Sequence, residues 1–181
     1  MFHYCPACAS AKIQFERDKR LSCPDCGFVY YHNTAAASGC VISNGEAVVL
    51  LVRGKEPACG KLDLPGGFVD NGEGVLEGLR RECQEELGLD LNAAAPGREF
   101  SFLASFPNTY PYKGVLYYTC DLFFTITVPG LSAADLRREP DEIAAIRFVN
   151  PADIRLEDLA FDSTRRAVKA YLSQYASSGF R

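Results

Sequence analysis

Three glutamates, Glu82, Glu85 and Glu86, fall within five consecutive residues near the middle of the 181-residue chain. If this segment is helical, residues three and four apart lie on one face, with Cβ atoms roughly 5–6 Å apart. Three carboxylates that converge in this way favour a hard divalent cation with oxygen ligands, Mg²⁺ or Mn²⁺. The alternative is a solvated helix face, because glutamate is a good helix former.

The negative charge of the chain is concentrated around these glutamates. Residues 67–89 hold six carboxylates against two arginines, a net charge of −4, which equals the net charge of the whole chain. Such a segment predicts a cationic partner. The negative total argues against a protein that coats nucleic acid and favours a cytoplasmic location. No apolar run approaches the ~20 residues that a bilayer requires, so we expect no membrane partner.

Four cysteines form a second group that can do chemistry. They make two Cys-x-x-Cys pairs separated by fourteen residues: Cys5 with Cys8, and Cys23 with Cys26. The amino terminus lacks the pattern of a secretion signal, so the pairs predict a metal site rather than disulfides. Four thiolates complete a tetrahedral Zn²⁺ site with no open position, which makes the zinc structural. We predict a zinc ribbon at residues 1–33 and a second domain at residues 34–181.

The glutamates need a helix to bring them together. Residues 74–87 predict one, because apolar residues recur every four positions at Val75, Leu79, Cys83 and Leu87, and Gly88 supplies a stop. The remaining pattern predicts strands at 38–42, 47–52, 62–64, 99–106, 115–128 and 145–149, and a helix at 163–175. Strands and helices do not alternate regularly, which favours an α+β sandwich.

The spacing around the glutamates resembles a family signature. Gly67 is followed after five residues by Glu73, and after seven more by the run Arg81-Glu82-Cys83-Gln84-Glu85-Glu86-Leu87-Gly88-Leu89. This resembles the Nudix box, Gly-x5-Glu-x7-Arg-Glu-U-x-Glu-Glu-x-Gly-U, where U is a bulky aliphatic residue. Only Cys83, at the first U position, departs from it. Residues 60–67 resemble the family's Gly-x-Trp-x-Leu-Pro-Gly-Gly segment, with Leu62 in place of Trp.

The resemblance implies a fold and a set of roles. The fold would be an α/β/α sandwich with a mixed sheet, in which the box forms a loop, a helix and a loop. Catalytic Mg²⁺ or Mn²⁺ would be held by Glu82, Glu85, Glu86 and the backbone carbonyl near Gly67. Arg81 would pair with Glu73 and orient the loop.

The reaction implied by the family is attack of water on a phosphorus atom of a diphosphate. The general base varies within the family. Glu85 is one candidate here. The other is an acid of the loop at residues 139–142, among which we choose Glu142 because the stretch precedes a predicted strand.

A zinc ribbon joined to a Nudix domain is similar to NADH pyrophosphatases and to some ADP-ribose or FAD pyrophosphatases. Residues 105–111 partly match the Ser-Gln-Pro-Trp-Pro-Phe-Pro segment of the NADH enzymes, without its Gln and Trp. Tyr110 and Tyr112, in a proline-rich loop, are the predicted substrate contacts.

The resemblance therefore predicts a Mg²⁺-dependent pyrophosphohydrolase of nucleotides joined by a diphosphate to another group. The products would be a nucleoside monophosphate and a second phosphate compound. The alternative is a nucleotide-sensing or RNA-binding protein that keeps the fold without turnover. We expect a small-molecule nucleotide as partner and a homodimer. Nucleic acid is not expected as a partner, although a capped RNA is left open as a substrate.

Overall fold

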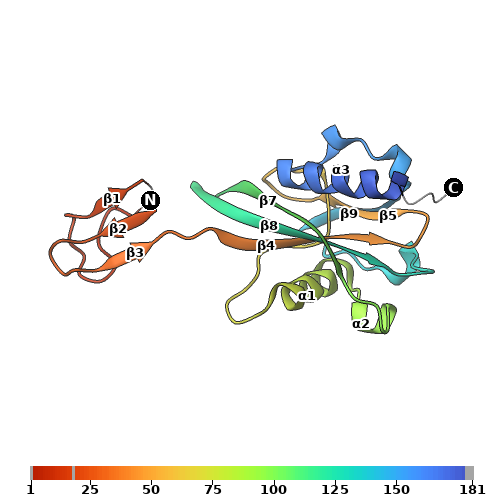
Figure 1. The fold of residues 1–181 in the computed structure, drawn as a ribbon, viewed down its shortest axis with the longest axis horizontal. Coiled ribbons are helices and arrows are strands. Elements are labelled where there is room, and N and C mark those ends of the chain that lie inside the picture. The colour runs from red at the N-terminus through yellow and green to blue at the C-terminus, as the bar shows by residue number, and fades with distance from the viewer. Residues whose placement is uncertain (1, 18, 178–181) are drawn as a thin grey trace.

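The computed structural model describes residues 2–17 and 19–177. Its first strands form a small three-stranded antiparallel sheet, order β1-β2-β3. These strands are β1 (Gln14–Glu16), β2 (Arg20–Ser22) and β3 (Val29–Tyr31). Figure 1 shows this sheet at one end of the molecule, joined to the rest by a single extended segment.

The second sheet has six strands and positions the candidate site. Its order is β6-β5-β4-β8-β7, and β9 also pairs with β5. The central strands β4 and β8 are parallel, whereas the other pairs are antiparallel, so the sheet is mixed as expected. The strands are β4 (Ala35–Ser43), β5 (Val48–Arg53), β6 (Leu62–Asp63), β7 (Ser101–Tyr112), β8 (Val115–Thr127) and β9 (Ile143–Val149).

Helices cover both faces of this sheet and confirm the α/β/α sandwich (Figure 1). On one side lie α1 (Val75–Leu87) and the short α2 (Leu91–Ala94), and on the other lies α3 (Asp162–Ser177). Short 3₁₀ turns complete the domain at Ala133–Asp135, Pro151–Asp153 and Leu156–Asp158. No helix among the described residues is long and apolar enough to cross a membrane.

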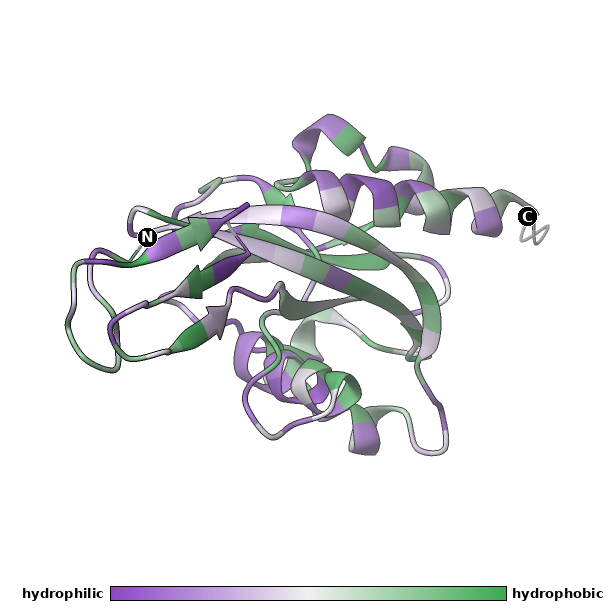
Figure 2. Ribbon diagram, turned by 60° about the vertical axis from the view of Figure 1, so that its left-hand side comes forward, coloured by the Kyte–Doolittle hydropathy of each residue, from purple (hydrophilic) through white to green (hydrophobic). Residues whose placement is uncertain are grey.

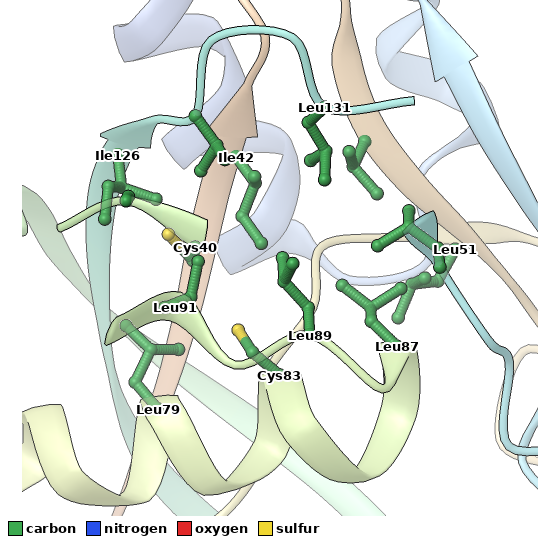
Figure 3. Close-up of a cluster of buried hydrophobic side chains, with 14 of the residues drawn as sticks. Cys40, Ile42, Leu51, Leu79, Cys83, Leu87, Leu89, Leu91, Ile126 and Leu131 are labelled. Carbon is green, nitrogen blue, oxygen red and sulfur yellow. The ribbon is translucent and has the colours of Figure 1, made fainter. Parts of the chain in front are cut away.

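Helix α1 forms where its apolar stripe predicts it. Leu79, Cys83 and Leu87 are fully buried, and Gly88 ends the helix in the left-handed conformation with φ of 63°. The buried cysteine therefore packs as a small hydrophobe at the position where the family signature has an aliphatic residue. Figure 3 shows these side chains reaching from the helix toward the sheet, where they meet Cys40, Ile42 and Leu51.

Helix α3 packs on the opposite face through one side of its surface. Ala167 and Val168 are buried against Leu50 of β5 and Phe123 of β8. Figure 2 shows hydrophilic and hydrophobic segments alternating along this helix, as expected for an amphipathic helix on a sheet. The fold thus has two apolar layers, and the candidate site lies between elements of both.

Strand β7 corrects one prediction. It runs to Tyr112 rather than ending near residue 106, so Tyr110 and Tyr112 lie in a strand and not in a proline-rich loop. Pro107 and Pro111 are compatible with this strand because β7 is at the edge of the sheet, where a missing N–H costs no ladder hydrogen bond on the open side.

Candidate active site

Arg81 lies at the centre of the acidic face of α1. Its guanidinium donates hydrogen bonds to both oxygens of Glu73, at 2.7 and 3.2 Å. It also contacts Glu82 at 2.9 Å and Glu85 at 3.1 Å. One further bond, of 3.0 Å, goes to the carbonyl of Phe68 in the preceding loop. Arg81 therefore ties the loop to the glutamates, and the Glu73 hydrogen bonds are the main cause that raises the Arg81 pKa.

Glu82 and Glu86 are held close to the glycine loop that precedes α1. The carboxylate of Glu86 accepts a hydrogen bond of 2.8 Å from the backbone N–H of Gly66. A Cβ atom added at Gly67 would lie 2.5 Å from an oxygen of Glu82, so a larger residue there would displace this carboxylate from the loop. Burial raises the pKa of Glu86 well above its ordinary range, and burial also raises that of Glu82.

The donor set of this region fits a hard divalent cation. Glu82 and Glu86 supply carboxylate oxygens, and Gly67 of the adjacent loop supplies a backbone carbonyl, which are the ligands that such a cation prefers. The raised pKa values of both carboxyl groups show that burial disfavours their charged forms, and a bound cation would favour them. Arg81 supplies part of that positive charge. No three carboxylates among the described residues gather as tightly as the cysteine sulfurs do.

A cavity of about 370 Å³ opens beside the glutamates. Glu82 and Glu86 line it, whereas Glu85 does not, and the Glu85 side chain is 57% exposed. The cavity extends from α1 across β4 and β8 to the start of α3. Its volume falls in the range of small-molecule sites.

Aromatic side chains form one wall of this cavity. Tyr110 packs edge-on against Phe68, with ring centroids 5.7 Å apart, and lies 5.6 Å from the Phe161 ring. Tyr112 lines the cavity further along β7. Such a wall provides flat apolar surface against which a ring can stack.

An ion pair that is only 16% and 15% exposed lies beside the aromatic wall. Arg53 contacts Asp63 at 3.0 Å and its guanidinium lies over the Phe161 ring, 4.9 Å from the centroid. Burial raises the pKa of Asp63, whereas Arg53 and the hydroxyl of Thr164 act against that shift. Arg53 belongs to no motif identified in the sequence, and it reaches this cavity from the end of β5, whereas Phe161 reaches it from the residue before α3.

Glu142 precedes β9 and lines the same cavity. It forms an ion pair with Lys55, and both side chains are about half exposed. The structure therefore places the loop acid near Glu82 and Glu86, while its role as a base stays a prediction.

The four amino-terminal cysteines gather around one point. All their sulfur atoms lie within 4.8 Å of one another, and Cys5–Cys26 and Cys8–Cys23 are each 3.7 Å apart. A tetrahedral site with Zn–S bonds of about 2.3 Å places its sulfurs about 3.8 Å apart. The four thiols are unlinked by disulfides and fit a closed zinc site.

Comparison with curated proteins finds relatives that are similar in sequence. The chain is 25% identical over 179 residues to the NAD-capped RNA hydrolase NudC of Deinococcus radiodurans, covering 97% of this chain and 59% of that protein. It is 41% identical over 61 residues to an ADP-ribose pyrophosphatase of Methanocaldococcus jannaschii, covering 34% of this chain and 36% of that one. The chain thus spans little more than half of the first relative's length.

Solved structures share the fold. A Nudix hydrolase from Nitrosomonas europaea superposes with a TM-score of 0.63 at 21% identity, covering 96% of this chain and 92% of that one. The family model of the Nudix domain matches residues 33–171, the stretch that carries the six-stranded sheet, helices α1 and α2, the first part of α3 and the glutamate face. By that match, the chain belongs to the Nudix family.

Proposed function

We propose that this protein is a divalent-metal-dependent pyrophosphohydrolase. Its substrate would be a nucleotide joined by a diphosphate to a second group, of the NAD, ADP-ribose or FAD type, and one product a nucleoside monophosphate. The observation that carries the proposal is that Glu82 and Glu86 open onto one end of a cavity whose wall is aromatic. If the diphosphate of the substrate binds beside Glu82 and Glu86, a ring of the same substrate can stack against the aromatic wall.

Mg²⁺ or Mn²⁺ would be held by Glu82, Glu85, Glu86 and the backbone carbonyl of Gly67. When bound, such an ion neutralises phosphate charge and lowers the pKa of a coordinated water. Arg81 and Glu73 position these ligands by fixing the loop against α1. Glu142 is the proposed proton acceptor, because it lines the cavity, whereas Glu85 is not among the lining residues.

The proposed substrate class rests on the relatives as well as on the cavity. A NAD cap on RNA and ADP-ribose are the substrates named for the two relatives, and both contain a nucleotide diphosphate. A NAD-type dinucleotide, free or at the end of an RNA, is therefore the first compound to test. Tyr110 and Tyr112 are the proposed ring contacts.

The amino-terminal sheet has a separate proposed role. We propose that Cys5, Cys8, Cys23 and Cys26 bind one structural Zn²⁺, which stabilises residues 1–33 as a unit apart from residues 34–181. The family match that begins at residue 33 supports this boundary. A homodimer and a cytoplasmic location remain predictions.

The test is a substrate panel offered to the purified protein with Mg²⁺ or Mn²⁺: NADH, ADP-ribose, FAD, dinucleoside polyphosphates and deoxynucleoside triphosphates. Metal-dependent release of a monophosphate from at least one diphosphate-linked compound supports the proposal. Tight binding of these nucleotides without hydrolysis at either metal overturns it and favours the nucleotide-sensing alternative. A Glu142→Gln variant with unchanged kcat removes Glu142 as the proton acceptor without affecting the assignment of the reaction.

A further inference from the structure

Two polar side chains in the floor of the cavity are buried without a full set of hydrogen bonds. Asp121 is 8% exposed and Thr119 is 3% exposed, and both lie on β8 and line the cavity. Among the described residues, neither Oδ1 of Asp121 nor Oγ1 of Thr119 has a hydrogen-bond partner. Leaving buried polar atoms unpaired is costly, so such atoms in a native fold call for an explanation.

The two side chains share one face of the sheet. Residues two apart on a strand point to the same side, and Phe123, the next in this series, packs toward α3. The second oxygen of Asp121 accepts a hydrogen bond of 2.6 Å from the Ser163 hydroxyl at the start of α3. This bond fixes the carboxylate and leaves Oδ1 as the buried oxygen that has no hydrogen-bond partner among the described residues.

A third buried hydroxyl does not belong to this pair. Ser38 Oγ also lacks a partner within the described part of the chain, but strand alternation places Ser38 with Cys40 and Ile42, which face α1. On the face that carries Asp121, the parallel neighbour β4 instead presents Ala37 and Gly39. The Phe123 ring covers Gly39, since a Cβ added there would lie 2.9 Å from it, whereas Ala37 lines the cavity beside Asp121.

We propose that Asp121 and Thr119 form hydrogen bonds with the polar edge of the substrate's ring, and that these bonds determine which nucleotides the protein binds. The inference rests on the proposed function, because it assigns the cavity to a nucleotide. A carboxylate oxygen accepts hydrogen bonds, whereas a threonine hydroxyl can donate or accept. The fitting group therefore carries an N–H₂ donor beside an acceptor.

Two rings of a NAD-type dinucleotide have that edge. Adenine offers its exocyclic amine beside a ring nitrogen, and nicotinamide offers the two halves of its carboxamide. Phe68, Tyr110 and Phe161, which form the aromatic wall, line the same cavity as Asp121 and Thr119. Replacing the amine by oxygen turns the donor that meets Asp121 into an acceptor, and a site built for the donor rejects that analogue.

The test measures equilibrium binding of four mononucleotides that contain no diphosphate and so undergo no turnover. AMP is compared with IMP, and nicotinamide mononucleotide with nicotinic acid mononucleotide. We expect the amine or amide member of one pair to bind roughly tenfold or more tightly than its oxygen analogue. The pair that is discriminated identifies the ring that occupies the floor.

Three variants separate ligand recognition from folding. Thr119→Val should weaken the preferred nucleotide roughly tenfold while leaving Tm unchanged or higher, because it removes a buried hydroxyl that has no partner in the described chain. Asp121→Asn should shrink the discrimination ratio, since its amide can donate to the oxygen analogue. Ser163→Ala is the matched control. It removes the hydrogen bond to Oδ2 of Asp121 and leaves Oδ1 in place, so Tm should fall while the discrimination ratio persists.

Two outcomes overturn the inference. One is a wild-type protein that binds both members of each pair within twofold. The other is a discrimination ratio that Asp121→Asn and Thr119→Val leave unchanged in folded protein. Failure of the proposed function is a different result: discrimination among mononucleotides would persist, while no diphosphate-linked compound is hydrolysed with any divalent metal.

Discussion

Replacing Arg81 with alanine should impair both the stability and the activity of the protein. The change removes the hydrogen bonds that join the glycine loop to Glu73, Glu82 and Glu85. The largest loss of stability should arise at Glu82, because this carboxylate is only 16% exposed and would lose its cationic partner. A buried charged group left unpaired costs about 1–3 kcal/mol, which for a chain of this size lowers Tm by roughly 2–12 °C.

The activity should fall further than the stability suggests. Residues that orient metal ligands typically cost about 10–100-fold in metal affinity or activity when they are removed. We therefore expect Arg81→Ala to lower kcat/KM by that factor and to raise the Mg²⁺ concentration needed for half-maximal rate. Thermal unfolding in the absence of Mg²⁺ and steady-state kinetics across a Mg²⁺ titration measure the two effects.

The neighbouring arginine is the matched control. Arg80 contacts the carbonyl of Leu76 at 3.2 Å and lies over the Phe100 ring, 4.9 Å from its centroid, without contacting the glutamates. Arg80→Ala should cost about 0.5–1 kcal/mol and leave the Mg²⁺ dependence unchanged. If both variants show the same loss of stability and the same kinetics, Arg81 does not organise the site.

Three further predictions follow from other parts of the structure. Cys23→Ser should remove zinc from purified protein, as measured by metal analysis, and should unfold residues 4–33 while Mg²⁺-dependent turnover largely persists; zinc-free wild-type protein would contradict this. Gly66→Ala should destabilise the fold by about 2 kcal/mol or more, because φ is +141° and the new Cβ would lie 2.1 Å from the Ser38 carbonyl oxygen. Gly72→Ala, at φ of +91° with nothing within 4 Å, should cost only the backbone strain, and equal losses in urea unfolding would refute the clash. Because the pKa of Asp63 is raised in the fold, its contribution to stability is present below the unfolded value of about 3.9 and is lost as pH rises through the folded value. Asp63→Asn should therefore flatten the decline of unfolding free energy across that window, and an unchanged slope would contradict the burial of this carboxyl.

The elements that local pattern specifies are those that the sequence predicts well. Helix α1 follows from a four-residue apolar repeat with a terminal Gly88, and the β4–β5 turn follows from Asn44-Gly45, where Asn44 Oδ1 accepts hydrogen bonds from the two residues that follow Gly45. Fixed spacing likewise predicts the glutamate face and the cysteine cluster. In both cases the residues that act together are close in the chain.

What depends on distant pairing is not visible in the sequence. Tyr110 lies in a strand because β7 pairs with β8 from Ser101 to Tyr112. The sequence does not indicate this pairing, because the prolines of β7 are typical of a loop. Asp121 and Thr119 read as ordinary polar residues of a strand until the parallel neighbour β4 and helix α3 bury them. Arg53 joins the cavity in the same way, from the end of β5. Sequence therefore predicts the glutamate face beside the cavity, and tertiary structure adds the aromatic wall, Thr119 and Asp121.

The most direct test of the central claim is Mg²⁺-dependent release of monophosphate from NADH and ADP-ribose by the wild type, a Glu85→Gln/Glu86→Gln double variant and Glu77→Gln. Glu77 lies on the same helix and bonds the Gly74 N–H at 2.7 Å, a contact that glutamine preserves. The account predicts turnover by the wild type and by Glu77→Gln that stops without Mg²⁺, and a loss of at least 100-fold, on the order of 2.7 kcal/mol, in the double variant. Equal monophosphate release by the double variant and the wild type would contradict it.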